Sequence, residues 1–133
     1  MGLADKSHLI KKAKTHKGRK FLEKRAPQLV EGEKTAVFIK GQKASNTVQQ
    51  FMRDIITLRG DQESSRVFMR KGHDMHPFEN IVPLESMTSK NDCGLFLFGH
   101  TQKKRPDNVV LGRTYDGKAL DFFELGIENF KAI

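Results

Sequence analysis

The sequence of 133 residues has one cysteine, four prolines and no tryptophan. A single thiol, Cys93, excludes an internal disulfide and a cysteine-rich zinc site, and it is typical of a reducing compartment. No stretch approaches the ~18 consecutive apolar residues of a membrane-spanning helix, so the sequence predicts no membrane partner. Ten phenylalanines and a hydrophobic content of 37% predict one domain whose core is modest and rich in aromatic rings.

Positive charge is in excess and is concentrated at one end of the chain. The net charge is +8, and residues 1–25 hold nine Lys or Arg against two acids, a surplus of seven. The other 108 residues hold 15 basic and 14 acidic side chains. The sequence therefore divides into a basic N-terminal arm, residues 1–27, and a nearly neutral body, residues 28–133. This division is typical of proteins that bind nucleic acid or another acidic surface.

The arm has a composition compatible with a helix over residues 5–25, and Pro27 predicts its end. Its apolar residues form no continuous stripe, and Gly18 costs about 1 kcal/mol relative to Ala in a helix. We expect a helical or partly helical extension that lies on another molecule. The alternative is a solvated basic tail.

The first part of the body predicts a strand, a helix and a second strand. "KTAVFIKG", residues 34–41, is a short β-rich run between turn residues. Residues 45–60 repeat apolar side chains at helical spacing, with Ser45 or Asn46 as N-cap and Gly60 as C-cap. "SRVFMRKG", residues 65–72, is the second strand. The three elements predict a βαβ unit.

The second part predicts an antiparallel meander. "LESMTSKN" is compatible with a short helix, and strands are expected over residues 94–100, 108–115 and 119–127. Asp116-Gly117 is a strong signal for a two-residue hairpin turn. The expected fold class is therefore α+β: a basic helical arm, one βαβ unit and an antiparallel meander.

Three patterns could suggest an enzyme, and each has a simpler explanation. "HDMH" offers His73 and His76 as ligands, but no third ligand has a recognisable spacing, so surface histidines are expected. Cys93 is expected to be a buried structural thiol rather than a nucleophile. "GQKASN", residues 41–46, lacks the spacing of a nucleotide-binding loop, although its amides could accept one phosphate of a polymer. The sequence therefore predicts no catalytic residue, no metal and no cofactor.

A cluster of cations lies between two predicted strands. Lys103, Lys104 and Arg105 occupy a turn, with Pro106 at its corner, and Arg113 follows on the next strand. Three adjacent like charges add nothing to folding, and a solvated surface is the simplest explanation. Together with the charge of the arm, the cluster favours a polyanion, because Arg and Lys both bind phosphate. Such binding should weaken steeply with salt.

The segment "DCGLFLFGHTQKKRPDNVVLGRTYDG", with "FLEKRAPQLVEGEKTAVFIKG" before it and "LDFFELGIENF" after it, closely resembles the Brix-domain family. A Brix domain has two similar halves related to the anticodon-binding fold of class II aminoacyl-tRNA synthetases. This chain resembles the first half, from about residue 10 onward. Asp107 departs from the family pattern, from which we expect Asn at this position. The aspartate places an acid beside the cations.

The resemblance implies a non-enzymatic assembly factor for the large ribosomal subunit in the nucleolus of a eukaryotic nucleus. The implied partners are rRNA (the large-subunit precursor and 5S rRNA), the regulator of ribosome synthesis, and the ribosomal proteins of the 5S particle. Ten residues are the expected RNA contacts: Lys11, Lys12, Lys14, Lys17, Arg19, Lys20, Lys103, Lys104, Arg105 and Arg113.

Two further expectations concern the whole chain. A half domain would leave open sheet edges and apolar patches, so we expect it to need the second half of the Brix domain or a chain that replaces it. Two other classes of function stay open: a basic ribosomal protein permanently bound to rRNA, and a metal-dependent hydrolase that uses His73 and His76.

Overall fold

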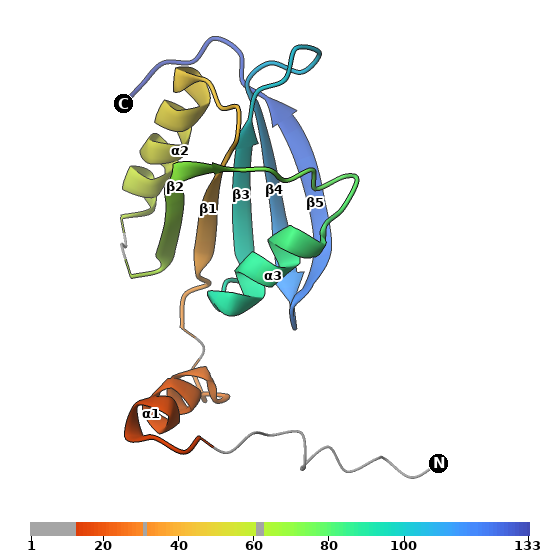
Figure 1. Ribbon diagram of the computed structural model, residues 1–133. Helices are drawn as coiled ribbons and strands as arrows, with labels where there is room; N and C mark the ends of the chain where they lie inside the picture. Colours follow the sequence, from red (N-terminus) through yellow and green to blue (C-terminus); the bar gives the residue numbers. More distant parts are fainter. Residues whose placement is uncertain (1–12, 31, 61–62) are drawn as a thin grey trace. The chain divides into compact units, whose positions relative to one another are not determined.

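The computed structural model describes residues 13–30, 32–60 and 63–133, and it divides into two units, residues 1–32 and 33–133 (Figure 1). The first unit contributes one helix, and the second contributes two helices and five strands within the described residues. The elements are α1 (His16–Arg25), β1 (Ala36–Gly41), α2 (Asn46–Arg59), β2 (Ser65–His73), α3 (Val82–Lys90), β3 (Leu95–His100), β4 (Asn108–Tyr115) and β5 (Lys118–Gly126). None of the described helices is both long and apolar enough to cross a membrane.

The helix α1 begins and ends where capping chemistry predicts. The Thr15 side chain accepts a hydrogen bond from the Gly18 N–H at 3.1 Å, which satisfies one free donor of the first turn. The helix ends at Arg25, and its C-cap Ala26 is extended because the following Pro27 disfavours the helical conformation of the residue before it. No residue of α1 is buried, so this helix buries no apolar face within its own unit.

The five strands form one mixed sheet in the order β2-β1-β3-β4-β5. The predicted βαβ unit is confirmed, since β1 pairs in parallel with β2, and the β3-β4-β5 meander is antiparallel. The structure adds a pairing that the sequence did not predict: β3 lies parallel to β1. The connection from β2 through α3 to β3 is therefore a second crossover.

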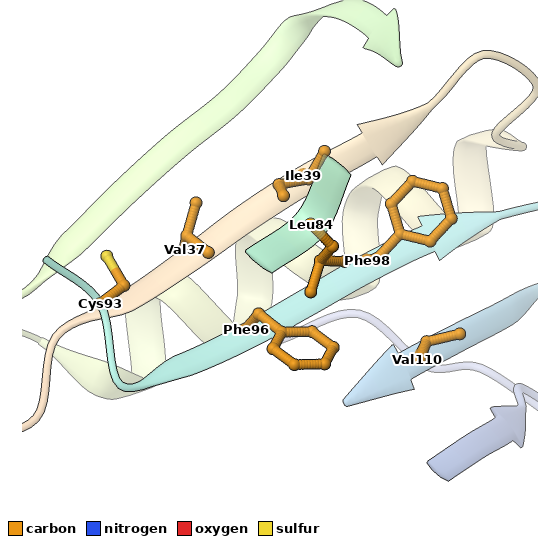
Figure 2. Packing of buried hydrophobic residues seen from close by; sticks show 7 residues of the cluster. All are labelled: Val37, Ile39, Leu84, Cys93, Phe96, Phe98 and Val110. Carbon is orange, nitrogen blue, oxygen red and sulfur yellow. The ribbon is translucent and has the colours of Figure 1, made fainter. Parts of the chain in front are cut away.

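The two crossover helices pack on opposite faces of the sheet. Successive β1 residues alternate between them, so Val37 and Ile39 pack with Leu84 of α3, while Phe38 packs with Val48 and Met52 of α2. Figure 2 shows the first of these clusters. The first crossover runs from β1 to β2, and the second runs back from β2 past β1 to β3. Two crossovers of one hand that move in opposite directions place their helices on opposite faces.

Caps and close packing fix α2 against the sheet. The Ser45 side chain accepts from the Val48 N–H, and Gly60 ends the helix in the left-handed conformation with φ +73°. Both residues are the caps that the sequence predicted. A Cβ on Gly99 of β3 would lie 2.5 Å from Val48 and 2.6 Å from Met52, so the absence of a side chain at Gly99 lets α2 approach the sheet.

The hairpin between β4 and β5 turns at Asp116-Gly117, as predicted. Both residues have positive φ, 50° and 74°, which is the conformation of a tight two-residue turn. A bulge between Arg113 and Thr114 then shifts the register, so that Arg113 faces Asp121. In a regular hairpin with this turn, Arg113 would face Leu120.

Candidate nucleic-acid interface

The carboxyl ends of the three parallel strands meet at one edge of the sheet, which we call the carboxyl edge. Its segments are residues 40–45, 71–76 and 100–107, which follow or end β1, β2 and β3. In Figure 1 the loop after β3 lies at the top of the sheet, beside the start of α2. The cations of the carboxyl edge are Lys40, Lys43, Lys71, Lys103, Lys104 and Arg105.

The predicted cation cluster forms the tip of the loop after β3. Gln102 and Arg105 exchange backbone hydrogen bonds of 3.0 and 3.2 Å, so Lys103 and Lys104 are the two central residues of a turn. Both lysines are exposed. The turn therefore directs two adjacent ammonium groups into solvent, as the sequence predicted.

Hydrogen bonds hold this turn to the loop before α2. The Thr101 N–H donates to the Lys43 carbonyl oxygen at 2.6 Å, and the Ser45 N–H donates to Thr101 Oγ1 at 3.0 Å. The Ser45 hydroxyl donates to Asp107, whose backbone has φ +50° and whose carbonyl accepts from Ile127 N–H at 2.8 Å. Asp107 is thus a structural residue at the base of the turn.

The two predicted arginine contacts of the body are paired with acids. Arg105 Nη1 lies 2.6 Å from Glu124 Oε2. Arg113 makes a bidentate pair with Asp121, at 2.8 and 2.7 Å. The hydrogen bonds from Arg113 lower the pKa of Asp121, and those that Asp121 accepts raise the pKa of Arg113. An anion would have to compete with these carboxylates for either guanidinium group.

The lysines at the tip have no such competitor. Within residues 13–30, 32–60 and 63–133, no acid lies within salt-bridge distance of Lys103 or Lys104. The same holds for Lys43, which sequence reasoning did not select. The sequence signal that could have identified Lys43 is its position directly after a predicted parallel strand. Its proximity to Thr101 could not be predicted, because it depends on the pairing of β1 with β3.

The arm contributes a second basic surface, described by itself. Lys14, Lys17, Arg19 and Lys20 are all exposed, while the predicted contacts Lys11 and Lys12 lie outside the described residues. In α1 the spacing of Lys17, Lys20 and Lys24 places the three on one face of the helix.

A cavity of about 350 Å³ opens at the carboxyl edge, between the ends of β1 and β3 and the segment after β2. Gly41, Gln42 and Lys43 line one side, and residues 73–76 line another. Phe98 and residues 100–103 complete it. The cavity therefore joins "GQK", "HDMH" and the cation turn, three segments far apart in the sequence.

The histidines of this cavity are not arranged for metal chemistry. His76 Nε2 pairs with Asp74 at 3.2 Å, and among the described residues no group of three or more His, Cys, Asp or Glu side chains could hold a metal ion. Cys93 is buried in the core, as predicted, and burial raises the pKa of its thiol to about 11. A thiol with this pKa is a poor nucleophile near neutral pH.

Comparison with known proteins is consistent with this architecture. Residues 41–133 match the Brix domain family. The chain is 45% identical over 124 residues to the Ribosome production factor 2 homolog of Drosophila melanogaster and 44% identical over 124 residues to that of Homo sapiens. It is 40% identical over 126 residues to the homolog of Arabidopsis thaliana.

These similarities cover most of this chain but less than half of each relative. Each of the three alignments covers 93% of this chain, but only 38% of the fly protein and 40% of the human and plant proteins.

Proposed function

Because this chain belongs to the Brix domain family, we propose that it is a non-enzymatic ribosome assembly factor that binds rRNA in the large-subunit precursor. Its relatives are named Ribosome production factor 2 homologs, which supports a role in making ribosomes. The observation that carries the proposal is the pair of adjacent, exposed lysines, Lys103 and Lys104, held on a hydrogen-bonded turn beside Lys43.

The exposed cations of the carboxyl edge are suited to a ribonucleotide backbone. A lysine ammonium is a mobile point charge that binds phosphate without demanding one geometry. The turn that carries Lys103 and Lys104 is fixed at its base by Asp107, so binding need not order the backbone first. The exposed Lys17, Arg19 and Lys20 of the arm would extend the contact along the RNA.

The proposal extends to the 5S particle and to protein partners. We expect the chain to help recruit or anchor the 5S ribonucleoprotein in the nucleolus, through 5S rRNA, its ribosomal proteins and the regulator of ribosome synthesis. These partners follow from the family resemblance and are tested by purification of the particle.

A protein partner is also expected on the α2 face of the sheet. A groove of about 520 Å³ lies there, lined by apolar side chains that include Ile55, Leu58, Leu111 and Phe123. Leu58 is 69% exposed and Phe123 is 55% exposed. An exposed apolar surface of this kind marks an interaction site. The second half of a Brix domain, or a chain that replaces it, is the expected occupant.

The direct test is the salt dependence of RNA binding. We expect the chain to bind in vitro transcribed 5S rRNA with an affinity that falls steeply as salt rises. Lys103→Ala/Lys104→Ala should weaken binding and make the log–log slope shallower by about 1.4, because each lost phosphate contact removes about 0.7.

The matched control removes two lysines from the opposite edge of the sheet. Lys34 and Lys90 are exposed and lie before β1 and β3, far along the strands from the tip turn. Lys34→Ala/Lys90→Ala changes the net charge by the same amount as Lys103→Ala/Lys104→Ala, but it should leave most of the salt dependence of RNA binding unchanged. Equal losses in the two double variants would show that only total charge matters and would contradict the proposed surface.

Sedimentation separates an assembly factor from a ribosomal protein. An assembly factor should co-sediment with precursor particles and be absent from mature large subunits. Stoichiometric amounts of the chain in mature large subunits would instead support a basic ribosomal protein permanently bound to rRNA.

A further inference from the structure

The cavity at the carboxyl edge is larger and more varied in chemistry than a phosphate contact requires. Its volume, about 350 Å³, lies at the lower end of the range for small-molecule sites, about 300–1,000 Å³. The backbone phosphates of RNA can bind to an open surface of lysines. A cavity with a histidine ring and amides beside those lysines indicates a ligand that has other groups besides its phosphate.

The topology explains why a cavity forms at this place. The chain leaves β1 toward α2 on one face of the sheet and leaves β2 toward α3 on the other. In open sheets, connections that diverge in this way leave a crevice outside the carboxyl ends of the strands, where ligands bind. In Figure 1 the segment after β2 crosses in front of the sheet before α3 begins. Residues 74–76 of this segment line the cavity.

Two contacts keep the walls of the cavity in place. The Gln42 N–H donates to the His73 carbonyl oxygen at 3.0 Å. A Cβ on Gly72 would lie 2.5 Å from Gln42 Cα, so the close approach of the two segments requires glycine there. The opposite wall is held by the bond from Thr101 to Lys43. The cavity is therefore built from fixed backbone.

The groups around the cavity match the parts of a nucleotide. Lys43 and Lys103 are exposed and can bind its phosphate. The His100 ring lies at the cavity and is backed by the buried ring of Phe98, with centroids 5.4 Å apart and planes 23° apart. Histidine rings stack on unpaired bases in many RNA complexes. Gln42 and Gln102 carry amides, which both donate and accept hydrogen bonds and can read the edge of a base.

His100 also carries an unsatisfied polar atom. Its Nδ1 is buried, and no group among the described residues hydrogen-bonds to it. Buried polar atoms are nearly always paired with protein, water or a ligand. The side chain is 14% exposed and Nε2 lies 3.7 Å from Glu124 Oε1, so Nδ1 is the ring nitrogen that has no partner in the part of the chain that the structure describes.

We propose that this cavity binds one unstacked nucleotide of an RNA strand, with the base between the His100 ring and the amides of Gln42 and Gln102, and the phosphate at Lys43 and Lys103. The proposal rests on the RNA binding proposed above and specifies the kind of RNA that is bound. The chain should bind an RNA segment with a bulged or unpaired nucleotide more tightly than a continuous double helix. Asp74, paired with His76, adds an acceptor that can take a hydrogen bond from an amino group of the base.

The test compares two RNA hairpins that differ in one residue. One hairpin has a single bulged 2-aminopurine nucleotide, and the other is fully paired. We expect the full chain to bind the bulged hairpin about tenfold more tightly, in line with the energy of stacking one base on an aromatic ring. The fluorescence of the 2-aminopurine should change on binding, because its stacking partners change.

Variants then separate the cavity from the general charge. Gln42→Ala/Gln102→Ala changes two exposed side chains and should abolish the preference for the bulged hairpin. Lys103→Ala/Lys104→Ala should weaken both hairpins. Gln28→Ala, an exposed amide in the first unit, is the control and should change neither. Thermal melts check that each variant is folded.

The outcomes distinguish the two proposals. Equal affinity for the two hairpins would overturn the nucleotide cavity alone and leave the charged surface standing. No binding of either hairpin or of 5S rRNA would overturn the proposed function, and the cavity with it. A free nucleoside monophosphate that binds as tightly as the bulged hairpin would overturn the assignment to an RNA strand.

Discussion

Asp107 accepts a hydrogen bond from the Ser45 hydroxyl, and its backbone carbonyl accepts one from Ile127. The left-handed backbone at φ +50° suits Asp and Asn better than other side chains. The acid beside the cations is therefore explained by its structural contacts. Sequence reasoning could not see this, because Ser45 and Asp107 are far apart along the chain.

Asp107→Ala should destabilise the fold by about 1–3 kcal/mol, because a partly buried hydroxyl loses its acceptor and alanine is strained at this backbone angle. Asp107→Asn keeps both an acceptor oxygen and the tolerance for positive φ, so it should stay close to the parent chain. The free energy of unfolding in urea measures both. If Asp107→Ala leaves the free energy of unfolding unchanged, the turn is held by other contacts.

His100 should make stability depend on pH. Burial lowers the pKa of its imidazole from the ordinary 6.5, although Glu124 opposes the shift. The unfolded chain binds this proton more readily than the folded chain does. The contribution of neutral His100 to the free energy of unfolding is therefore complete above about pH 6.5, and it is lost as pH falls through the lower pKa of the folded state. Urea unfolding at pH 8 and pH 5.5 should show the loss, and His100→Gln should reduce it. An unchanged pH dependence in that variant would contradict the role of His100.

At the scale of elements, the local signals of α2 and of the β4–β5 hairpin were sufficient for prediction. Ser45 and Gly60 cap α2, and Asp116-Gly117 turns the hairpin, since each depends on a few adjacent residues. The pairing of β3 with β1 was not predictable, because strand order depends on which segments are covered by helices. The ion pair between Arg113 and Asp121 was not predictable either, because a bulge after Arg113 shifts the register of β4 against β5.

The cavity was missed for the same reason. Its walls come from three segments that only the sheet order brings together. Taken one at a time, "GQK" resembled an incomplete phosphate loop, and His73 and His76 resembled ordinary surface histidines. The charge of Lys103 and Lys104, in contrast, is a local property of a turn and was visible in the sequence.

The packing of α2 on the sheet can be tested at Gly99. Gly99→Ala places a methyl group within 2.6 Å of two side chains of α2, so the helix must shift and stability should fall by about 1–3 kcal/mol. Gly94→Ala is the control, because its nearest atom, the Thr114 carbonyl oxygen, lies 3.9 Å away. Thermal or urea unfolding compares the two, and equal effects would contradict close packing at Gly99.

At the scale of the molecule, an uncovered apolar face and a charged edge imply two kinds of partner. The face carries Leu58, Phe123 and Leu125, each at least half exposed. Purified without a partner, the chain should self-associate as concentration rises, and Phe123→Lys should reduce this. Tyr115→Lys, at an exposed aromatic outside the groove, is the control. Sedimentation velocity that shows a monomer at all concentrations would contradict the expectation.

The two basic surfaces should also act together. The arm and the carboxyl edge lie in different units of one chain, so binding of one raises the effective concentration of the other near the same RNA. This account requires ribonucleotide backbone near both surfaces.

Ultraviolet crosslinking of precursor particles purified through this chain, read by mass spectrometry, tests that requirement most directly. The account predicts nucleotide adducts within residues 41–43 and 101–105 and on the arm around Lys17 and Lys20. Adducts confined to the opposite edge, near Lys34 and Lys90, or their absence from both basic surfaces, would contradict it.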